Sequence, residues 1–214
     1  SLGVPAVTAH RALTAGETAT RLAPGALDGQ VVLVAGGAGA VGNAAVQLAV
    51  WAGAVVVTTV SNEEKAALAR AAGAHHVVDY RAEDVVARVG EIAPDGVDLV
   101  VEVAPADNLA SDLEVVRNRG TIAFYANNGG NEAALPVRPT FGKNVRLQGL
   151  LLYTLGADLL AAATEDVTAA VAAGALRVGD DAGLPLHHFA LEATAAAHDA
   201  VESGAVGKVL LDIG

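Results

Sequence analysis

Short apolar, β-branched runs alternate with stretches of helical period through most of the chain. The runs show almost no alternation of apolar and polar residues, which indicates strands buried on both faces, as in a parallel sheet covered by helices. Crossovers between parallel strands are almost always right-handed, so the pattern predicts a doubly wound sheet that binds its ligand outside the carboxyl ends of the strands. The expected strands are 31–35, 54–60, 75–78, 97–103 and 120–125, and the expected helices between them are 40–52, 62–72, 82–90 and 107–116.

The two ends of the chain are less regular. A short helix is expected within residues 1–15, followed by a polar loop over 16–30. Beyond Tyr125 we expect a loop over 126–142 and a sixth strand, 144–153, that closes the sheet. The fold class is therefore α/β, a Rossmann-type doubly wound parallel six-stranded sheet with helices on both faces. The last elements expected are a helix over 156–173, a loop through Pro185, a helix over 191–203 and a strand over 207–213.

A glycine-rich turn joins the first expected strand to the first long helix. Gly37, Gly39 and Gly42 fit the pattern G-x-G-x-x-G. The first glycine allows a sharp turn, the second lets a pyrophosphate approach the backbone, and the third lets the helix pack closely on the strand. The free N–H groups and positive dipole end of helix 40–52 then face that phosphate. The pattern predicts dinucleotide binding; the alternative is an alanine- and glycine-rich turn with only a packing role.

The end of the second strand distinguishes NAD from NADP. NAD-binding proteins usually carry an acidic residue there, which holds the ribose 2′-hydroxyl and would repel a 2′-phosphate. Here Ser61 and Asn62 occupy that place, and Lys65 can turn its ammonium back toward the strand end. This arrangement favours NADPH, although Ser61 could instead cap the next helix in a capping box with Glu64. Tyr80 is a second candidate at the adenosine end, with a boundary tyrosine packed on the core as its alternative.

Composition narrows the function classes further. The chain has 214 residues, no cysteine and a formal net charge of −11. The acidic balance argues against nucleic acid and anionic membranes as partners. The lack of cysteine, of a secretory signal and of a long apolar run favours a cytoplasmic protein without a membrane span. No metal site is expected, because the adjacent pairs His75–His76 and His187–His188 would point to opposite faces of a strand.

Several segments resemble the medium-chain dehydrogenase/reductase superfamily, and its zinc-independent NADPH:quinone oxidoreductase branch in particular. Members of that family carry an N-terminal GroES-like catalytic domain, which this sequence lacks. The resemblance therefore implies a connecting helix (1–15), a dinucleotide-binding domain (16–153), and a C-terminal segment (154–214) that would pack on the catalytic domain. The similar segments are 2–13, 36–42 with 45–49, 61–65, 72–80 and 207–213.

The resemblance also implies roles for individual residues. Gly39, Ala40 and Val41 would contact the pyrophosphate, and Ser61, Lys65 and Tyr80 would hold the 2′-phosphate end. The apolar strand ends could equally belong to the core, since pockets and cores share composition. By the resemblance, the nicotinamide would be lined by Val103, Ala104, Tyr125, Ala126, Asn127 and Leu152.

The expected activity is hydride transfer from NADPH to a small electrophile, a quinone or an α,β-unsaturated carbonyl. No catalytic residue is assigned within the chain, because a proton donor would belong to the absent domain, and the chain alone is expected to be inactive. One alternative is a non-catalytic dinucleotide-binding or redox-sensing module, and a weaker one is a fragment of a zinc-dependent alcohol dehydrogenase. A homodimer is expected through the edge strand near 144–153.

Overall fold

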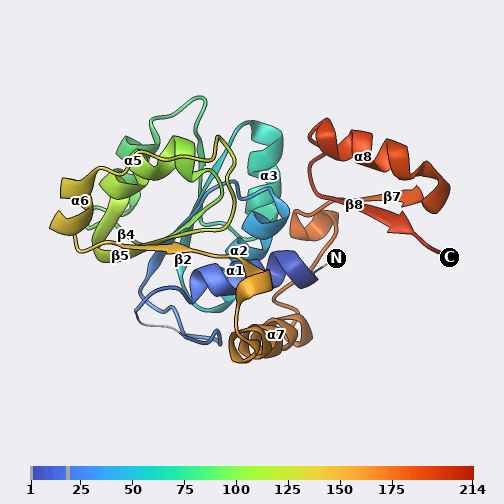
Figure 1. Cartoon of the computed structure of the whole chain (residues 1–214), viewed down its shortest axis with the longest axis horizontal. Helices are drawn as coiled ribbons and strands as arrows, with labels where there is room; N and C mark the ends of the chain where they lie inside the picture. The colour runs from blue at the N-terminus through green and yellow to red at the C-terminus, as the bar shows by residue number, and fades with distance from the viewer. Residues whose placement is uncertain (1, 18–19) are drawn as a thin grey trace.

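A single parallel sheet of six strands forms the centre of the protein (Figure 1). The computed structural model describes residues 2–17 and 20–214. The strand order is β3-β2-β1-β4-β5-β6, which confirms the predicted Rossmann-type sheet. The strands are β1 (Val31–Val34), β2 (Val55–Val60), β3 (His76–Asp79), β4 (Val97–Glu102), β5 (Val116–Phe124) and β6 (Arg146–Gly149).

Helices cover both faces of the sheet. Successive side chains of β1 point to opposite faces, so Val32 and Val34 pack in the layer of α1, α2 and α7, whereas Leu33 packs in the layer of α4 and α5. The helices are α1 (Gly3–Leu13), α2 (Ala40–Trp51), α3 (Glu63–Ala71), α4 (Val85–Ile92), α5 (Pro105–Val115), α6 (Val137–Gly142), α7 (Ala157–Ala172) and α8 (Thr194–Glu202), with short 3₁₀ turns η1 (Leu152–Thr154), η2 (Asp180–Ala182) and η3 (Leu191–Ala193).

Three predicted elements need correction. The sixth strand ends at Gly149 and not at Tyr153, because the chain turns away after Leu150 donates its N–H to Phe124 O and continues into η1. The loop predicted over 126–142 contains α6, whose Pro139 sits in the first turn, where a missing N–H costs no helical hydrogen bond. The loop predicted after Pro185 contains a strand, β7 (Leu186–Ala190).

The end of the chain forms a separate small unit, the C-terminal lobe (residues 186–212). In it β7 pairs in parallel with β8 (Lys208–Asp212), and α8 connects the two strands. Figure 1 shows this lobe beside the main sheet, next to α3, while α7 lies under α1. Within residues 2–17 and 20–214, every helix is too short or too polar to span a lipid bilayer.

A buried polar network joins α7 to α1. His10 Nε2 lies 2.8 Å from Asp166 Oδ2, and the backbone N–H of Leu22 donates to the same oxygen at 2.8 Å. Arg21 donates to both oxygens of Asp166. The C-terminal segment, for which the resemblance predicts packing on a catalytic domain, thus also packs on the first helix of this chain.

Candidate nucleotide site

The glycine-rich turn between β1 and α2 depends on close approaches of the backbone. Gly36 has a φ of +70°, so the sharp turn occurs there and not at Gly37 as predicted. A Cβ on Gly37 would lie 2.2 Å from Thr58 Oγ1, so this glycine lets the turn pack against β2. A Cβ on Gly42 would lie 2.2 Å from Gly36 O, so the third glycine brings α2 against the turn, where contact with the strand was predicted.

The N-terminus of α2 is open to a ligand. Gly39 is its N-cap, no side chain caps the helix, and the first turn holds no acidic residue. The first amides of a helix have no acceptor within the helix. This end would therefore attract an anion, both through the helix dipole and through the N–H groups of Ala40, Val41 and Gly42.

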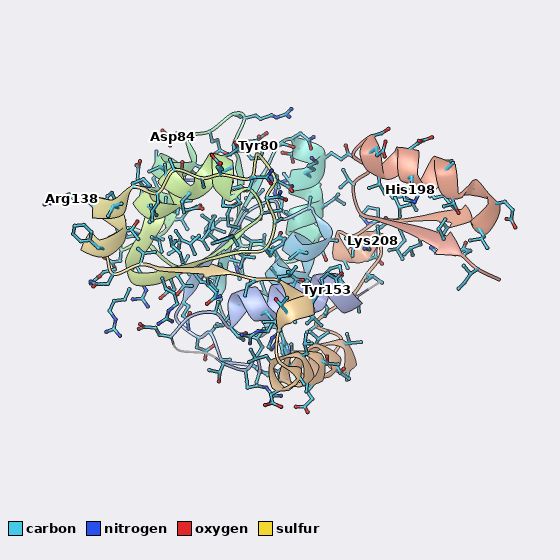
Figure 2. The ribbon with its side chains drawn as sticks, in the orientation of Figure 1. Tyr80, Asp84, Arg138, Tyr153, His198 and Lys208 are labelled. Carbon is cyan, nitrogen blue, oxygen red and sulfur yellow. The ribbon has the colours of Figure 1, made fainter. Side chains whose placement is uncertain are left out.

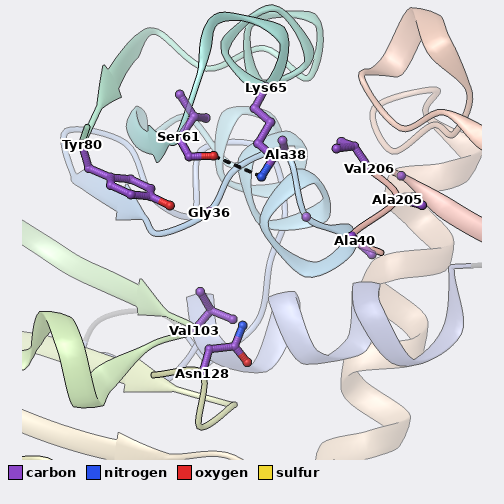
Figure 3. Close-up of a pocket in the computed structure, with 14 residues that line it drawn as sticks. Gly36, Ala38, Ala40, Ser61, Lys65, Tyr80, Val103, Asn128, Ala205 and Val206 are labelled. Atoms are coloured by element: carbon purple, nitrogen blue, oxygen red, sulfur yellow. Dashed lines mark hydrogen bonds between the residues drawn. The ribbon is translucent and has the colours of Figure 1, made fainter. Parts of the chain in front are cut away.

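The end of β2 carries the polar side chains that the sequence singled out. Lys65 Nζ donates to Ser61 Oγ at 3.1 Å, so the ammonium folds back to the strand end, as Figure 3 shows. Asn62 is the N-cap of α3, and its Oδ1 accepts a hydrogen bond from the Lys65 N–H at 2.9 Å. The alternative in which Ser61 caps this helix is therefore wrong.

These groups meet in a pocket of about 360 Å³ at the carboxyl ends of the strands (Figure 3). Tyr80 lines it from the end of β3 and is half exposed (Figure 2), and Val103 lines it from the end of β4. Among its described lining residues, Lys65 has the only charged side chain. The predicted site residues that line the pocket are Gly39, Ala40, Ser61, Lys65, Tyr80 and Val103.

The other predicted site residues lie outside this pocket. Gly37 and Gly42 act through packing, and Asn62 through its cap. Among the residues predicted at the nicotinamide, Ala104 lines a second, adjoining pocket. Asn127 is exposed and donates to Asn131, and Leu152 lies in η1. Their roles at a nicotinamide stay predictions. The predicted residues that do not line the pocket are Gly37, Val41, Gly42, Asn62, Ala104, Tyr125, Ala126, Asn127 and Leu152.

The sequence reasoning missed one wall of the pocket. Gly204, Ala205, Val206 and Gly207, at the turn between α8 and β8, line it together with Asn128 from the loop after β5. The one available signal was the pair of glycines flanking Ala205–Val206, since closely spaced glycines often mark a turn that approaches other backbone.

A second pocket, of about 570 Å³, adjoins the first and shares Gly36, Tyr80, Val103 and Asn128 with it. Three acidic residues that the sequence reasoning also missed line it. Asp107 is exposed, whereas Glu102, at the end of β4, is 1% exposed, and Asp112, on α5, is 4% exposed.

Glu102 and Asp112 form a buried acid pair. Glu102 Oε1 accepts hydrogen bonds from the Ala104 N–H and from Asn108 Nδ2. Burial, the charge of Glu102 and a hydrogen bond to it together raise the pKa of Asp112 well above its ordinary value. This direction favours the protonated, uncharged form of Asp112 beside Glu102. Burial, followed by the charge of Glu102, also raises the pKa of Tyr125.

Within residues 2–17 and 20–214, no group of three or more histidine, cysteine, aspartate or glutamate side chains is placed to hold a metal ion. The adjacent histidines of β7 have separate partners: His187 Nε2 lies 2.8 Å from Val206 O, and His188 Nδ1 lies 2.9 Å from Asp212 Oδ1.

Comparisons with known proteins identify a matching family and several relatives. Residues 40–175 match the family described as zinc-binding dehydrogenase. Human quinone oxidoreductase is 28% identical over 214 residues, covering 99% of this chain and 61% of the human protein. A Burkholderia 2-haloacrylate reductase is 39% identical over 119 residues, covering 55% of this chain and 35% of the reductase.

Among solved structures, the mycobacterial protein Rv1454c in complex with NADPH superposes with a TM-score of 0.81 and 28% identity. The match covers 97% of this chain and 63% of the mycobacterial chain. The chain thus spans about three fifths of the length of the human relative, at 61%.

Proposed function

Because the chain belongs to the zinc-binding dehydrogenase family, we propose that it is the NADPH-binding part of an oxidoreductase that transfers a hydride to a quinone or an α,β-unsaturated carbonyl. One observation supports NADPH as the nucleotide. Of the described residues that line the pocket at the N-terminus of α2, one has a cationic side chain and none an acidic one, in a chain with a net charge of −11. A protein so acidic repels a phosphorylated ligand unless the local donors are arranged to bind it.

The residues present fit a phosphorylated dinucleotide. The open N–H groups of α2 would hold the diphosphate. Lys65 and Ser61 would hold a 2′-phosphate at the end of β2, where an acidic residue would favour NAD. Tyr80 and Val103 provide flat or apolar surface on the neighbouring strand ends. When bound, the cofactor supplies the hydride from its nicotinamide, while the chain binds and orients it.

The names of the relatives support the proposed substrate class. Quinone oxidoreductase and 2-haloacrylate reductase are named for electron-poor acceptors, a quinone and an activated alkene. Such acceptors take up a hydride without a covalent enzyme intermediate, so orientation and electrostatics can carry the chemistry.

The nucleotide assignment is tested by titrating the chain with NADPH and, separately, NADH, followed by nicotinamide fluorescence. We expect tighter binding of NADPH. Lys65→Ala should weaken NADPH binding about tenfold to a hundredfold and leave NADH nearly unchanged, since a hydrogen bond between charged groups contributes about 1.5–3 kcal/mol. Ser61→Asp should reverse the preference, because a carboxylate there repels a 2′-phosphate and accepts from a 2′-hydroxyl.

Arg70→Ala is the matched control. It removes one positive charge from the same helix, but within the part of the chain that the structure describes, the ion pair of Arg70 is with the exposed Glu63. Its affinity for NADPH should stay within a factor of two of the unchanged chain, since exposed pairs contribute little. Equal binding of NADPH and NADH would refute the 2′-phosphate assignment, and binding of neither would refute the nucleotide site.

The predicted homodimer stays a proposal. β6 is an edge strand of the sheet. The turn that follows it exposes Tyr153, at 81%, and Leu151, at 55%; Figure 2 shows the place of Tyr153. Unpaired strand edges favour pairing with a second strand. Sedimentation as a monomer at high concentration would contradict it.

A further inference from the structure

Two buried amide side chains stand one turn apart on α2. Asn43 is 1% exposed and Gln47 is 4% exposed. Neither lines the nucleotide pocket, and Gln47 lies about 6 Å further along the helix axis than Asn43, away from the phosphate-binding end. Buried amides are costly unless they are hydrogen-bonded, so their partners indicate what they hold in place.

Their partners belong to the segment that leads to the C-terminal lobe. Gln47 Nε2 donates to Asn43 Oδ1 at 2.7 Å and to Arg177 O at 3.1 Å, and Gln47 Oε1 accepts from the Arg177 N–H at 3.0 Å. Asn43 Nδ2 donates to Ala182 O at 2.7 Å. The two side chains thus fix the backbone of residues 177–182 to the helix that would bind the phosphates.

The next residue is held against α3. Gly183 has a φ of +67°, and a Cβ there would lie 2.0 Å from Leu68 O. The segment therefore meets the main domain at two helices, through side-chain amides on α2 and through direct backbone contact on α3.

The same segment fixes the loop that lines the pocket. A Cβ on Gly207 would lie 2.2 Å from Pro185 O, and the Lys208 N–H donates to Pro185 O at 2.8 Å. His187 Nε2 lies 2.8 Å from the carbonyl oxygen of Val206. Loop 204–207 is therefore bonded to residues 185–187, which begin two residues after Gly183.

From this continuous set of contacts we propose that Gln47 and Asn43 are positioning residues that hold loop 204–207 in place as the wall of the nucleotide pocket beside the N-terminus of α2. One helix then offers its N–H groups to the diphosphate and also sets the position of the C-terminal wall. The inference rests on the proposed function, because it assigns this loop to NADPH binding.

The test compares Gln47→Leu with the unchanged chain. Leucine has nearly the same volume but forms no hydrogen bond. NADPH affinity, measured by nicotinamide fluorescence, should fall about tenfold, because a loop that is no longer fixed must be ordered on binding. Hydrogen exchange should become faster at residues 177–207, while residues 31–60 keep their protection.

Two further variants separate positioning from general destabilisation. Gly183→Ala should move the same segment away from α3, so it should also lower NADPH affinity and speed hydrogen exchange at residues 177–207. It serves as the test variant if Gln47→Leu does not fold. Val89→Ala truncates a fully buried residue in the layer of α4 and α5. It should lower the melting temperature and leave NADPH affinity unchanged.

The outcomes are distinct. Faster exchange at residues 177–207 with unchanged NADPH affinity overturns the inference and leaves the proposed function intact. Lower NADPH affinity without faster hydrogen exchange at residues 177–207 overturns the inference as well. If the unchanged chain binds no NADPH, the proposed function fails, and this inference fails with it.

Discussion

Gly42 is the residue at which α2 touches the glycine-rich turn. Replacing it with alanine would place a Cβ 2.2 Å from Gly36 O, so the helix must move away from the turn. We expect Gly42→Ala to destabilise the fold by about 1–3 kcal/mol, as other over-packing substitutions do, and to weaken NADPH binding. Denaturant unfolding and fluorescence titration measure the two effects.

Gly90 provides the control for this prediction. It also lies inside a helix, but nothing lies within 4 Å of a Cβ placed there. Gly90→Ala should stabilise the chain by about 0.5–1 kcal/mol, because alanine loses less backbone entropy in a helix. Equal effects at the two glycines would show that the contact with Gly36 is unimportant.

The acid pair of Glu102 and Asp112 should make the stability of the fold depend on pH. The raised pKa means that Asp112 binds a proton more tightly in the folded chain than in the unfolded chain, so folding takes up a proton above the ordinary pKa. The stability due to this group is fully present below its ordinary pKa and decreases as the pH rises toward the raised value. Asp112→Asn cannot ionise and still donates to Glu102, so it should remove this loss.

Unfolding in denaturant at pH 5, 6, 7 and 8 tests this prediction. The stability of Asp112→Asn relative to the unchanged chain should rise with pH, by about 1.4 kcal/mol per pH unit while Asp112 stays protonated in the fold. Asp107→Asn removes an exposed carboxylate from the same helix and should show no such trend. A constant difference between Asp112→Asn and the unchanged chain across this range would contradict the shared proton.

Local patterns predicted some of these residues and not others. The glycine turn and the Ser61–Lys65 contact follow from short-range rules about turns and helix starts, so the sequence was sufficient for them. Glu102 was missed because a carboxylate within a β-branched run has no local signal of its partner. Asp112 meets it only after α5 folds back along the sheet.

At the scale of elements, a buried network of hydrogen bonds around Asp166 joins α7 to α1. Asp166 is 6% exposed, and burial alone would raise its pKa. Hydrogen bonds from Arg21, His10 and the Leu22 N–H outweigh burial and hold the pKa of Asp166 at about 2. Burial, partly offset by Asp166, lowers the pKa of His10 below 6.5.

Because the pKa values of His10 and Asp166 are both lowered in the fold, the folded chain should lose stability in acid. Each group has a depressed pKa in the fold, so its contribution is present above the ordinary pKa and is lost as the pH falls. The His10 contribution decreases below about pH 6.5, and the Asp166 contribution decreases from about pH 4 toward pH 2. The contact between α1 and α7 should therefore loosen at low pH.

Asp166→Asn tests this contact at neutral pH. It leaves His10 and Arg21 without a carboxylate and should cost about 2–3 kcal/mol, less than a fully buried pair because Arg21 is half exposed. Glu165→Gln removes the neighbouring charge, whose pair with Arg21 is exposed, and should cost under about 1 kcal/mol. Thermal unfolding of both variants measures the difference, and similar losses would contradict a specific role for Asp166.

Whole elements were predicted well where they are buried on both sides. β1, β2 and β4 are mostly buried and rich in valine and leucine, which is typical of a parallel sheet covered on both faces. α6 and β7 were missed because each is short, follows a proline and is partly exposed, so neither shows a clear period.

For the molecule as a whole, the sheet order determines where the site forms. β1 lies between β2 and β4, so the chain leaves β1 in one direction and returns beside it from the other. A crevice opens at such a switch point outside the carboxyl ends of the strands, and the pocket lies there. This much follows from the order of strands and helices in the sequence. The wall at 204–207 depends on long-range docking, and its two flanking glycines indicate a turn but not the surface that the turn meets.

The pocket takes one wall from residues 36–40 and another from residues 204–207. A ribosome releases these two walls in that order, with strands β2 to β6 of the main sheet between them. The sheet can fold on the nascent chain before the second wall exists, since N-terminal parts of a protein generally fold first during synthesis. A complete pocket therefore forms only after residue 207 has emerged.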